Sequence, residues 1–313
     1  MKLLFLGTPH FAVPTLRCLA ASRHEIVAVV TNPDRPRGRG RRLAPPPVKE
    51  AAEELGLPVL QPESPRDRGL PARLAELGAD AFAVVAYSIL PRRILAVPPR
   101  GSVNLHPSLL PAYRGAAPII WALFNGETET GITTFRLNPR VDAGDLLLQE
   151  RVAIGADETA GELEARLSEL GARMMARSFD GLEDGTLTPA PQSDEGVTRA
   201  PKLSRADGRL DWAWTAAQVH NRVRGANPVP GAFTEWGGQP LKVHRTRLRA
   251  EVAPGAPGAV LEAGDGGLVV SAADGALELL EVQPAGKAAM KGADFVRGYP
   301  IAAGDRLGAP APA

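Results

Sequence analysis

The stretch Gly101-Ser102-Val103-Asn104-Leu105-His106-Pro107-Ser108-Leu109-Leu110-Pro111 carries the pattern on which the fold of this chain depends. Its first half alternates apolar and polar side chains, which predicts a short strand over residues 102–106. Successive side chains of a strand point to opposite faces, so Asn104 and His106 share one face. Pro107 disfavours a helical conformation at His106 and keeps that residue extended. An amide and an imidazole are thereby expected side by side at the end of a strand.

A second segment, Val141-Asp142-Ala143-Gly144-Asp145, supplies a carboxylate downstream. An amide donor can hold a developing oxyanion while an imidazole moves a proton, which suits acyl chemistry. A carboxylate can orient the imidazole and stabilise its charged form. Each pattern alone also has a plainer interpretation, because Asn-x-His on a strand is more often structural, and Asp142-Ala143-Gly144 can be an ordinary turn. Both interpretations stay open at this point.

The first half of the chain alternates strand and helix patterns, which predicts a layered α/β domain. Gly7-Thr8-Pro9, after the first strand, lacks the further glycines of a dinucleotide loop, and Pro9 removes a backbone donor, so a nicotinamide site is not expected. Strands are expected at residues 2–6, 25–31, 81–86, 102–106, 130–137 and 146–153. Helices are expected at residues 14–22, 48–55, with Val48, Ala51, Ala52 and Leu55 on the apolar face, and about 162–179.

The second half begins with a polar stretch rich in proline and glycine, residues 181–207, which is typical of a linker. A single helix is expected within residues 212–225. Short strands separated by glycine turns follow, which predicts a small barrel. The expected strands are residues 232–236, 241–248, 259–261, 268–272 and 277–282.

The composition limits the class of protein. A chain of 313 residues with 44% hydrophobic content can bury a sizeable core and form two domains. The single cysteine, Cys18, excludes an internal disulfide framework and fits a reducing cytosol. No run approaches the ~20 apolar residues of a membrane span, and neither end resembles a targeting segment, so we expect a cytoplasmic protein with no membrane partner. Five scattered histidines and one cysteine argue against a zinc site.

Basic residues are unevenly distributed, although the net charge is only +1. One group crowds a loop punctuated by Pro36, Gly38 and Gly40, and a second alternates along a predicted strand, which would place it on one face. Local basic patches on a near-neutral chain indicate a polyanionic partner, whereas a solvated surface is the plainer interpretation. The first group is Arg35, Arg37, Arg39, Arg41 and Arg42, and the second is Arg245, Arg247 and Arg249.

The longer string His106-Pro107-Ser108-Leu109-Leu110-Pro111-Ala112-Tyr113-Arg114-Gly115-Ala116-Ala117-Pro118 resembles the signature of the 10-formyltetrahydrofolate-dependent formyltransferases. Glu129-Thr130-Gly131-Ile132-Thr133 and the segment around Asp142 resemble it too. The resemblance runs almost from end to end, through Gly7-Thr8-Pro9-His10-Phe11-Ala12, Asn32-Pro33-Asp34-Arg35-Pro36, Asp211-Trp212 and Gln283-Pro284-Ala285-Gly286-Lys287. The Gly115-Ala116-Ala117-Pro118 variant is similar to the members that formylate initiator methionyl-tRNA.

This resemblance implies a Rossmann-like α/β formyltransferase domain and a smaller C-terminal OB-like β-barrel. It implies a catalytic domain at residues 1–186, a linker at 187–207 and a tRNA-binding domain at 208–313. The implied co-substrate is 10-formyltetrahydrofolate, without a metal, and the implied partner is initiator methionyl-tRNA bound to a monomer. Translation initiation is the process expected to use the product.

The resemblance also assigns residues. Catalytic roles fall on Asn104, His106 and Asp142, and a cis peptide is expected at Leu110-Pro111. Folate contacts fall on Ser108, Leu109, Leu110 and Pro111 and on Ala86 and Tyr87, whose segment is one residue shorter than the family's pattern Ala-Tyr-Gly-x-Ile-Leu-Pro. The match to the family's tRNA-inserting loop implies tRNA contacts at Arg35, Arg37, Arg39, Arg41 and Arg42, with Arg39 as the key loop arginine. The alternate spacing on a strand, rather than the resemblance, predicts contacts to the tRNA backbone at Arg245 and Arg247.

Three further points stay open from the sequence. His10 stands where the family often has an acid, and we expect an exposed loop residue rather than a catalytic one. A folate-dependent formyltransferase acting on a nucleotide or sugar amine is the alternative enzyme. A non-enzymatic RNA-binding protein would keep the basic loop but would not require Asn104, His106 and Asp142 together.

Overall fold

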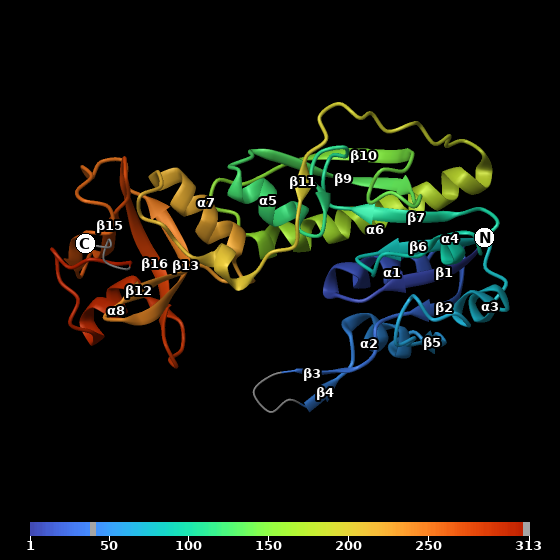
Figure 1. Cartoon of the computed structure of the whole chain (residues 1–313), viewed down its shortest axis with the longest axis horizontal. Helices are drawn as coiled ribbons and strands as arrows, with labels where there is room; N and C mark the ends of the chain where they lie inside the picture. Colours follow the sequence, from blue (N-terminus) through green and yellow to red (C-terminus); the bar gives the residue numbers. More distant parts are fainter. Residues whose placement is uncertain (38–41, 309–313) are drawn as a thin grey trace. The chain divides into compact units, whose positions relative to one another are not determined.

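The computed structural model describes residues 1–37 and 42–308 and forms two compact units. The first unit comprises Met1–Pro118, Glu129–Ala153 and Glu164–Ala200. The second comprises Ile119–Thr128, Ile154–Leu163 and the chain from Pro201 onward. Figure 1 shows both units with most of their helices and strands labelled.

The first unit is built on a seven-stranded sheet with the order β10-β9-β7-β6-β1-β2-β5. The five strands from β5 to β7 run parallel, β9 pairs antiparallel with β7, and β10 pairs antiparallel with β9 (Figure 1). The strands are β1 (Lys2–Gly7), β2 (Glu25–Val30), β5 (Val59–Leu60), β6 (Ala81–Val85), β7 (Ser102–His106), β9 (Glu129–Arg136) and β10 (Leu146–Ala153). The α/β class predicted from the alternating pattern is confirmed.

The strand order reverses beside β1. The strands that follow β1 directly, β2 and β5, lie on one side, whereas β6 and β7 lie on the other. In open α/β sheets, ligands bind beyond the carboxyl ends of the strands near such a reversal. His106 is the last residue of β7, and Ala86 follows β6 directly, so the sequence motifs lie at this edge.

The helix for which the sequence predicted an apolar face is α2 (Pro47–Glu54). Helix α2 buries Pro47, Val48, Ala51 and Ala52, whereas Leu55 is 38% exposed, so its assignment to the apolar face was wrong. Leu55 is the C-cap residue, and the chain turns away at Gly56, where φ is +68°. The other helices are η1 (His10–Ala12), α1 (Val13–Ala20), α3 (Leu70–Ala75), α4 (Arg92–Leu95) and α6 (Ala160–Asp184), whose residues from Glu164 onward belong to this unit.

Helix α6 covers the face of the sheet opposite to the catalytic motif. Thr133 lies across from His106 in the antiparallel register of β7 and β9, so their side chains share a face and Thr134 points the other way. The Thr134 hydroxyl hydrogen-bonds the Ser178 hydroxyl of α6 at 2.7 Å. The face that carries Asn104 and His106 is therefore left for the site.

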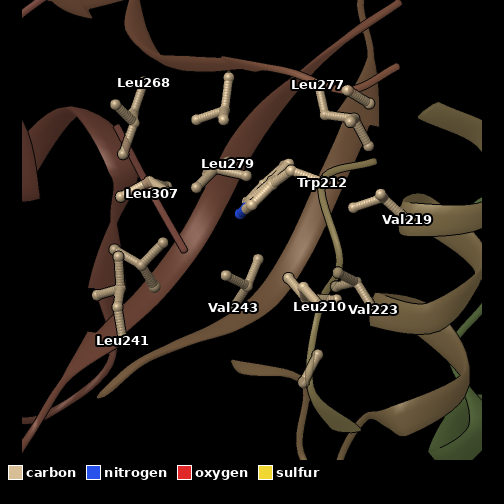
Figure 2. Packing of buried hydrophobic residues seen from close by; sticks show 14 of the residues in the cluster. Leu210, Trp212, Val219, Val223, Leu241, Val243, Leu268, Leu277, Leu279 and Leu307 are labelled. Atoms are coloured by element: carbon tan, nitrogen blue, oxygen red, sulfur yellow. The ribbon is translucent and has the colours of Figure 1, made fainter. Parts of the chain in front are cut away.

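The second unit is β-rich, as predicted, and its strands follow the order β12-β13-β16-β15-β14, with β17 beside β16. Trp212 lies at the centre of its core, and its indole donates to the Thr234 hydroxyl at 3.0 Å (Figure 2). The elements are η2 (Arg205–Gly208), α7 (Ala216–Ala226), β12 (Phe233–Trp236), β13 (Gln239–Leu248), β14 (Val260–Gly264), β15 (Gly267–Ser271), β16 (Ala276–Pro284), β17 (Met290–Lys291) and α8 (Gly292–Gly298).

The core of the second unit also takes residues from earlier in the chain. Phe124, at the end of helix α5 (Pro118–Phe124), is 8% exposed and belongs to this cluster, and Ile120 and Trp121 pack against it. Compact units and linear segments of the chain therefore do not coincide. The boundaries 1–186, 187–207 and 208–313 stay a prediction.

Candidate active site

The last strand residue before Pro107, His106, carries the imidazole of the candidate site. Its side chain is 6% exposed, and the ring nitrogen Nε2 lies 2.9 Å from the carbonyl oxygen of Tyr113. A carbonyl only accepts, so this contact puts a proton on Nε2 and leaves Nδ1 facing the opposite way. Nδ1 lies 3.8 Å from Oδ2 of Asp142. The predicted imidazole and carboxylate therefore come together across 36 residues of sequence.

The Asp142 carboxylate is held by the backbone. Its Oδ2 accepts a hydrogen bond of 2.8 Å from the Gly115 N–H, in strand β8 (Arg114–Gly115). The side chain is 14% exposed. A carboxylate with one fixed donor keeps its other lone pairs for the imidazole or for a water molecule between the two groups.

Asn104 lies two residues before His106 on the same face of β7, as predicted, and lines a pocket there. Within residues 1–37 and 42–308, its side-chain amide has no hydrogen-bond partner in the protein. An amide held on a strand with its donors free is suited to bind an oxygen that develops negative charge.

Backbone strain concentrates at this site. Among the described residues, the three non-glycine residues with positive φ are Ala86 (+47°), Tyr113 (+59°) and Asp142 (+48°). Ala86 follows β6, Tyr113 supplies the acceptor for His106, and Asp142 is the candidate carboxylate. Such conformations persist only where the surrounding contacts enforce them, and they cluster at functional sites.

The loop after His106 is fixed by two polar residues that the sequence reading missed. The Thr133 hydroxyl donates to the Ser108 carbonyl at 2.7 Å and accepts from the Leu110 N–H at 3.2 Å. Gln149 donates to the Leu110 carbonyl at 2.7 Å. Their role depends on the register of β9 and β10 with β7, which no local pattern reveals. The Leu110-Pro111 peptide is cis, as predicted.

A pocket of about 100 Å³ opens beside Asn104. Apolar side chains from β6 and α4 form one part, and the loop that carries Asp142 forms another. Tyr87, predicted to bind folate, lines it, and its buried hydroxyl has no hydrogen-bond partner among the described residues. Ser108, Leu109, Leu110 and Pro111 lie outside this lining, and the Ser108 hydroxyl donates to the Ala112 carbonyl at 2.7 Å. The lining includes Val84, Leu90, Leu95, Leu137, Asn138 and Val141.

The predicted arginine loop forms a hairpin of β3 (Arg35–Arg37) and β4 (Arg42–Ala44). Arg39 and Arg41 lie outside the described residues. Arg35 is exposed, and the preceding Asp34 accepts hydrogen bonds from Lys49 at 2.8 Å and from Gln61 at 2.7 Å. These bonds lower the pKa of the Asp34 carboxyl, with Gln61 the larger cause, and they fix the base of the hairpin.

The second basic group lies on and just after β13 of the second unit, and carboxylates accompany it. Arg245 lies 2.5 Å from Glu162, and Arg247 lies 2.7 Å from Glu278. Arg249 contacts Glu251 and lies 3.6 Å from Glu278. The hydrogen bonds from Thr159 and Arg245 lower the pKa of Glu162 to about 2, with the Thr159 backbone the largest cause. This face is therefore less positive than the spacing of its arginines predicts.

The remaining candidate residues are less informative. His10 is exposed, as predicted. Burial raises the pKa of the partly buried Cys18 thiol, which disfavours the reactive thiolate. In the described part of the chain, no three metal-ligating side chains gather at one place. None of its helices has the length and apolar character that a membrane crossing requires.

Both parts of the chain match known protein families. Residues 1–179 match the formyl transferase family, and residues 202–300 match the formyl transferase C-terminal domain. A methionyl-tRNA formyltransferase of Solibacter usitatus is 48% identical over 309 residues, which cover 98% of this chain and 99% of the relative.

Solved structures share the fold. An N-formyltransferase of Helicobacter canadensis, in complex with folinic acid and dTDP-3-aminofucose, superposes with a TM-score of 0.67 at 17% identity, covering 91% of this chain and 99% of that one. HypX of Aquifex aeolicus, in complex with tetrahydrofolic acid, gives a TM-score of 0.63 at 19% identity, covering 95% of this chain and 47% of that one. With both domains matched in order and a full-length relative at 48% identity, the chain belongs to the formyltransferase family.

Proposed function

We propose that this chain transfers the formyl group of 10-formyltetrahydrofolate to the α-amino group of methionine on initiator methionyl-tRNA. The observation that carries the proposal is the meeting of His106 and Asp142 beside Asn104, in a chain that matches methionyl-tRNA formyltransferases over nearly its full length. The product would serve translation initiation in the cytoplasm, and we expect the enzyme to act as a monomer without a metal ion.

The proposed mechanism is direct attack of the amine on the formyl carbon. The C–N bond to the amino acid forms, a tetrahedral oxyanion develops, and the bond to N10 of the folate breaks as N10 takes up a proton. The Asn104 amide donates to the oxyanion. His106 assists the oxyanion or carries the proton released by the amine, and Asp142 stabilises the ring when Nδ1 is protonated.

The pocket beside Asn104 is the proposed site for the pterin end of the folate. Its apolar walls suit a flat ring, and the buried, unpartnered hydroxyl of Tyr87 offers a hydrogen-bonding group at that wall. Ala86 and the loop of Ser108, Leu109, Leu110 and Pro111 are proposed to shape the site through their backbone, since the Ser108 hydroxyl is occupied within the loop.

The basic groups are the proposed tRNA contacts. Arginine in residues 35–42 can bridge phosphates and stack on bases, which lysine does poorly. The face of Arg245 and Arg247 would contribute contacts to the phosphate backbone. Because carboxylates accompany these two side chains, we expect them to contribute less than the hairpin does.

The test is a formyl-transfer assay with charged initiator tRNA and, separately, with nucleotide and sugar amines. Turnover with methionyl-tRNA alone supports the proposal. Turnover with the small amines and none with the tRNA would favour the alternative folate-dependent enzyme. Binding of tRNA with no transfer to any amine would indicate a non-enzymatic RNA-binding protein.

A further inference from the structure

The segment between helix α6 and the second unit is attached to the candidate site. Gln192, predicted to lie in a linker, accepts a hydrogen bond of 2.8 Å from Nε of Arg114 and a second one from Nη2 of the same side chain. Its own amide donates to the Gly144 carbonyl at 2.9 Å. One side chain thus joins the signature motif after Pro111 to the loop that carries Asp142.

Both ends of this bridge lie next to the contacts that fix the catalytic pair. Arg114 stands between Tyr113, whose carbonyl accepts from His106, and Gly115, whose N–H donates to Asp142. Gly144 lies two residues after Asp142. A displacement at either end of Gln192 is therefore transmitted through only one or two peptide units to His106 or Asp142.

The same segment makes backbone contacts on both sides of Gln192. Ala190 and Leu146 exchange two hydrogen bonds, of 2.7 and 2.9 Å. Strand β11 (Arg199–Ala200) pairs parallel with β8, and the Tyr113 N–H donates to the Thr198 hydroxyl at 2.8 Å. The segment is thus hydrogen-bonded to the two parts of the chain that meet at the candidate site, the stretch around Tyr113 to Gly115 and the start of β10.

Close packing leaves the two loops little freedom apart from this segment. A Cβ added at Gly144 would lie 1.6 Å from the Arg136 carbonyl oxygen, and one added at Gly115 would lie 2.4 Å from that of Ala200. Both values are far below a van der Waals contact. The loop of Gly144 is therefore held against Arg136 of the sheet, and the loop of Gly115 is held against Ala200 of β11. Gln192 connects the two loops to each other.

We propose that Gln192 is a positioning residue for formyl transfer, which sets the separation of the Asp142 carboxylate from His106 by tying Gly144 to Arg114. The inference rests on the proposed catalytic roles of His106 and Asp142. Misplacement of a catalytic group by ~1 Å can lower turnover by about a hundredfold. Loss of the Gln192 contacts is therefore expected to lower turnover measurably.

The experiment measures kcat and KM for formylation of methionyl-tRNA by the full chain. Gln192→Ala should lower kcat by about tenfold or more and change KM for either substrate less. Gln192→Glu keeps the acceptor for Arg114 but loses the donor to Gly144, and its kcat should fall similarly. Asp194→Ala, an exposed neighbour without a side-chain partner within the described residues, is the matched control and should leave kcat unchanged. Full kcat in folded Gln192→Ala or Gln192→Glu would overturn the proposal.

A double variant separates positioning from general stability. If Gln192 acts through Asp142, then Gln192→Ala should lower kcat in the unaltered enzyme but not further in Asp142→Asn. Multiplicative losses in the double variant would overturn the positioning role. An Asp142→Asn enzyme with near-normal turnover would instead refute the proposed catalytic role, so the failure of one proposal can be told from the failure of the other.

Discussion

The candidate active site and the basic face of β13 differ in how their polar side chains are held. His106 and Asp142 are largely buried, and each has a backbone partner within the same unit. Arg245 and Arg247 have side chains 43% and 61% exposed, and their partners are carboxylates. Chemistry requires fixed geometry, whereas binding to a phosphate backbone tolerates exchange of partners, because salt and counterions compete for the same charges.

The largest expected effect is at the buried pair. His106→Ala should lower turnover by roughly two to three orders of magnitude, because it removes the group that assists the oxyanion or the proton transfer. Asp142→Asn should also be severe, since it removes the charge that supports the protonated ring. Turnover is measured at saturating substrates, with circular dichroism as the check on folding. A folded His106→Ala or Asp142→Asn variant with normal turnover would contradict the catalytic role of the buried pair.

The arginine group of Arg35, Arg37, Arg39, Arg41 and Arg42 is the next test. Arg39→Ala should lower kcat/KM for methionyl-tRNA by about tenfold, the equivalent of about 1.4 kcal/mol, while folate binding stays unchanged. The measurement is formylation kinetics beside a folate titration. Arg73→Ala, an exposed arginine on helix α3, is the control. Unchanged tRNA kinetics for Arg39→Ala would indicate that this arginine does not contact the tRNA and belongs to a solvated surface.

Substitutions on the β13 face should change tRNA affinity less, and they should mainly change its dependence on salt concentration. Arg245→Ala should reduce the slope of tRNA affinity against salt concentration by roughly one unit if the side chain contacts a phosphate. Glu162→Gln removes the carboxylate beside Arg245 and should strengthen tRNA binding at low salt. Equal affinities and slopes for both variants and the unaltered chain would exclude this face from the tRNA interface.

Deletion of the chain after Asp207 is a coarser way to test this face. It would leave Phe124, together with Ile120 and Trp121, without the core that buries them. A loss of activity on deletion would then mix lost tRNA contacts with exposed apolar surface. Single substitutions on β13 are therefore the sharper measurement.

The smallest predicted effect is on stability. Burial lowers the pKa of His220, whose ring contacts the Thr246 hydroxyl at 2.9 Å and the Ala156 carbonyl at 3.2 Å. The unfolded chain therefore takes up this proton first as the pH falls through about 6.5, and stability is lost below that pH. One proton changes the unfolding free energy by at most about 1.4 kcal/mol per pH unit. Melting temperatures from about pH 8 to 5.5 should fall less steeply for His220→Gln than for the unaltered chain; parallel curves would refute this.

The strands and the catalytic motif were predictable because their signals are local. Strand β7 has the bounds expected from alternation and Pro107, and Asn104 and His106 share a face for the same reason. The family resemblance assigned a catalytic role to Asp142, which by itself could be an ordinary turn residue, and it predicted the cis peptide at Pro111. Leu55 was misplaced because the helix ends one residue earlier than its apolar pattern.

The residues that support the site were not predictable, because their partners are remote in the sequence. Thr133 belongs to a motif that the sequence analysis quoted, but its contacts with the Ser108 to Pro111 loop, like those of Gln149, depend on the register of three strands. Gln192 stands in a stretch whose composition is typical of a linker, and the two-residue strand β11 carries no periodic signal. The carboxylate beside Arg245 was not predictable for the same reason, since Glu162 lies 83 residues from Arg245.

Single-turnover formylation of methionyl-tRNA by folded Asn104→Ala, with enzyme in excess and 10-formyltetrahydrofolate saturating, tests whether formyl transfer takes place at this edge of the sheet. Asn104 has no structural hydrogen bond to lose within the described chain, so its replacement tests oxyanion binding rather than folding. We expect a rate lower by roughly two to three orders of magnitude, with tRNA and folate affinities preserved. A near-normal rate would contradict the assignment of this edge of the sheet as the site of formyl transfer.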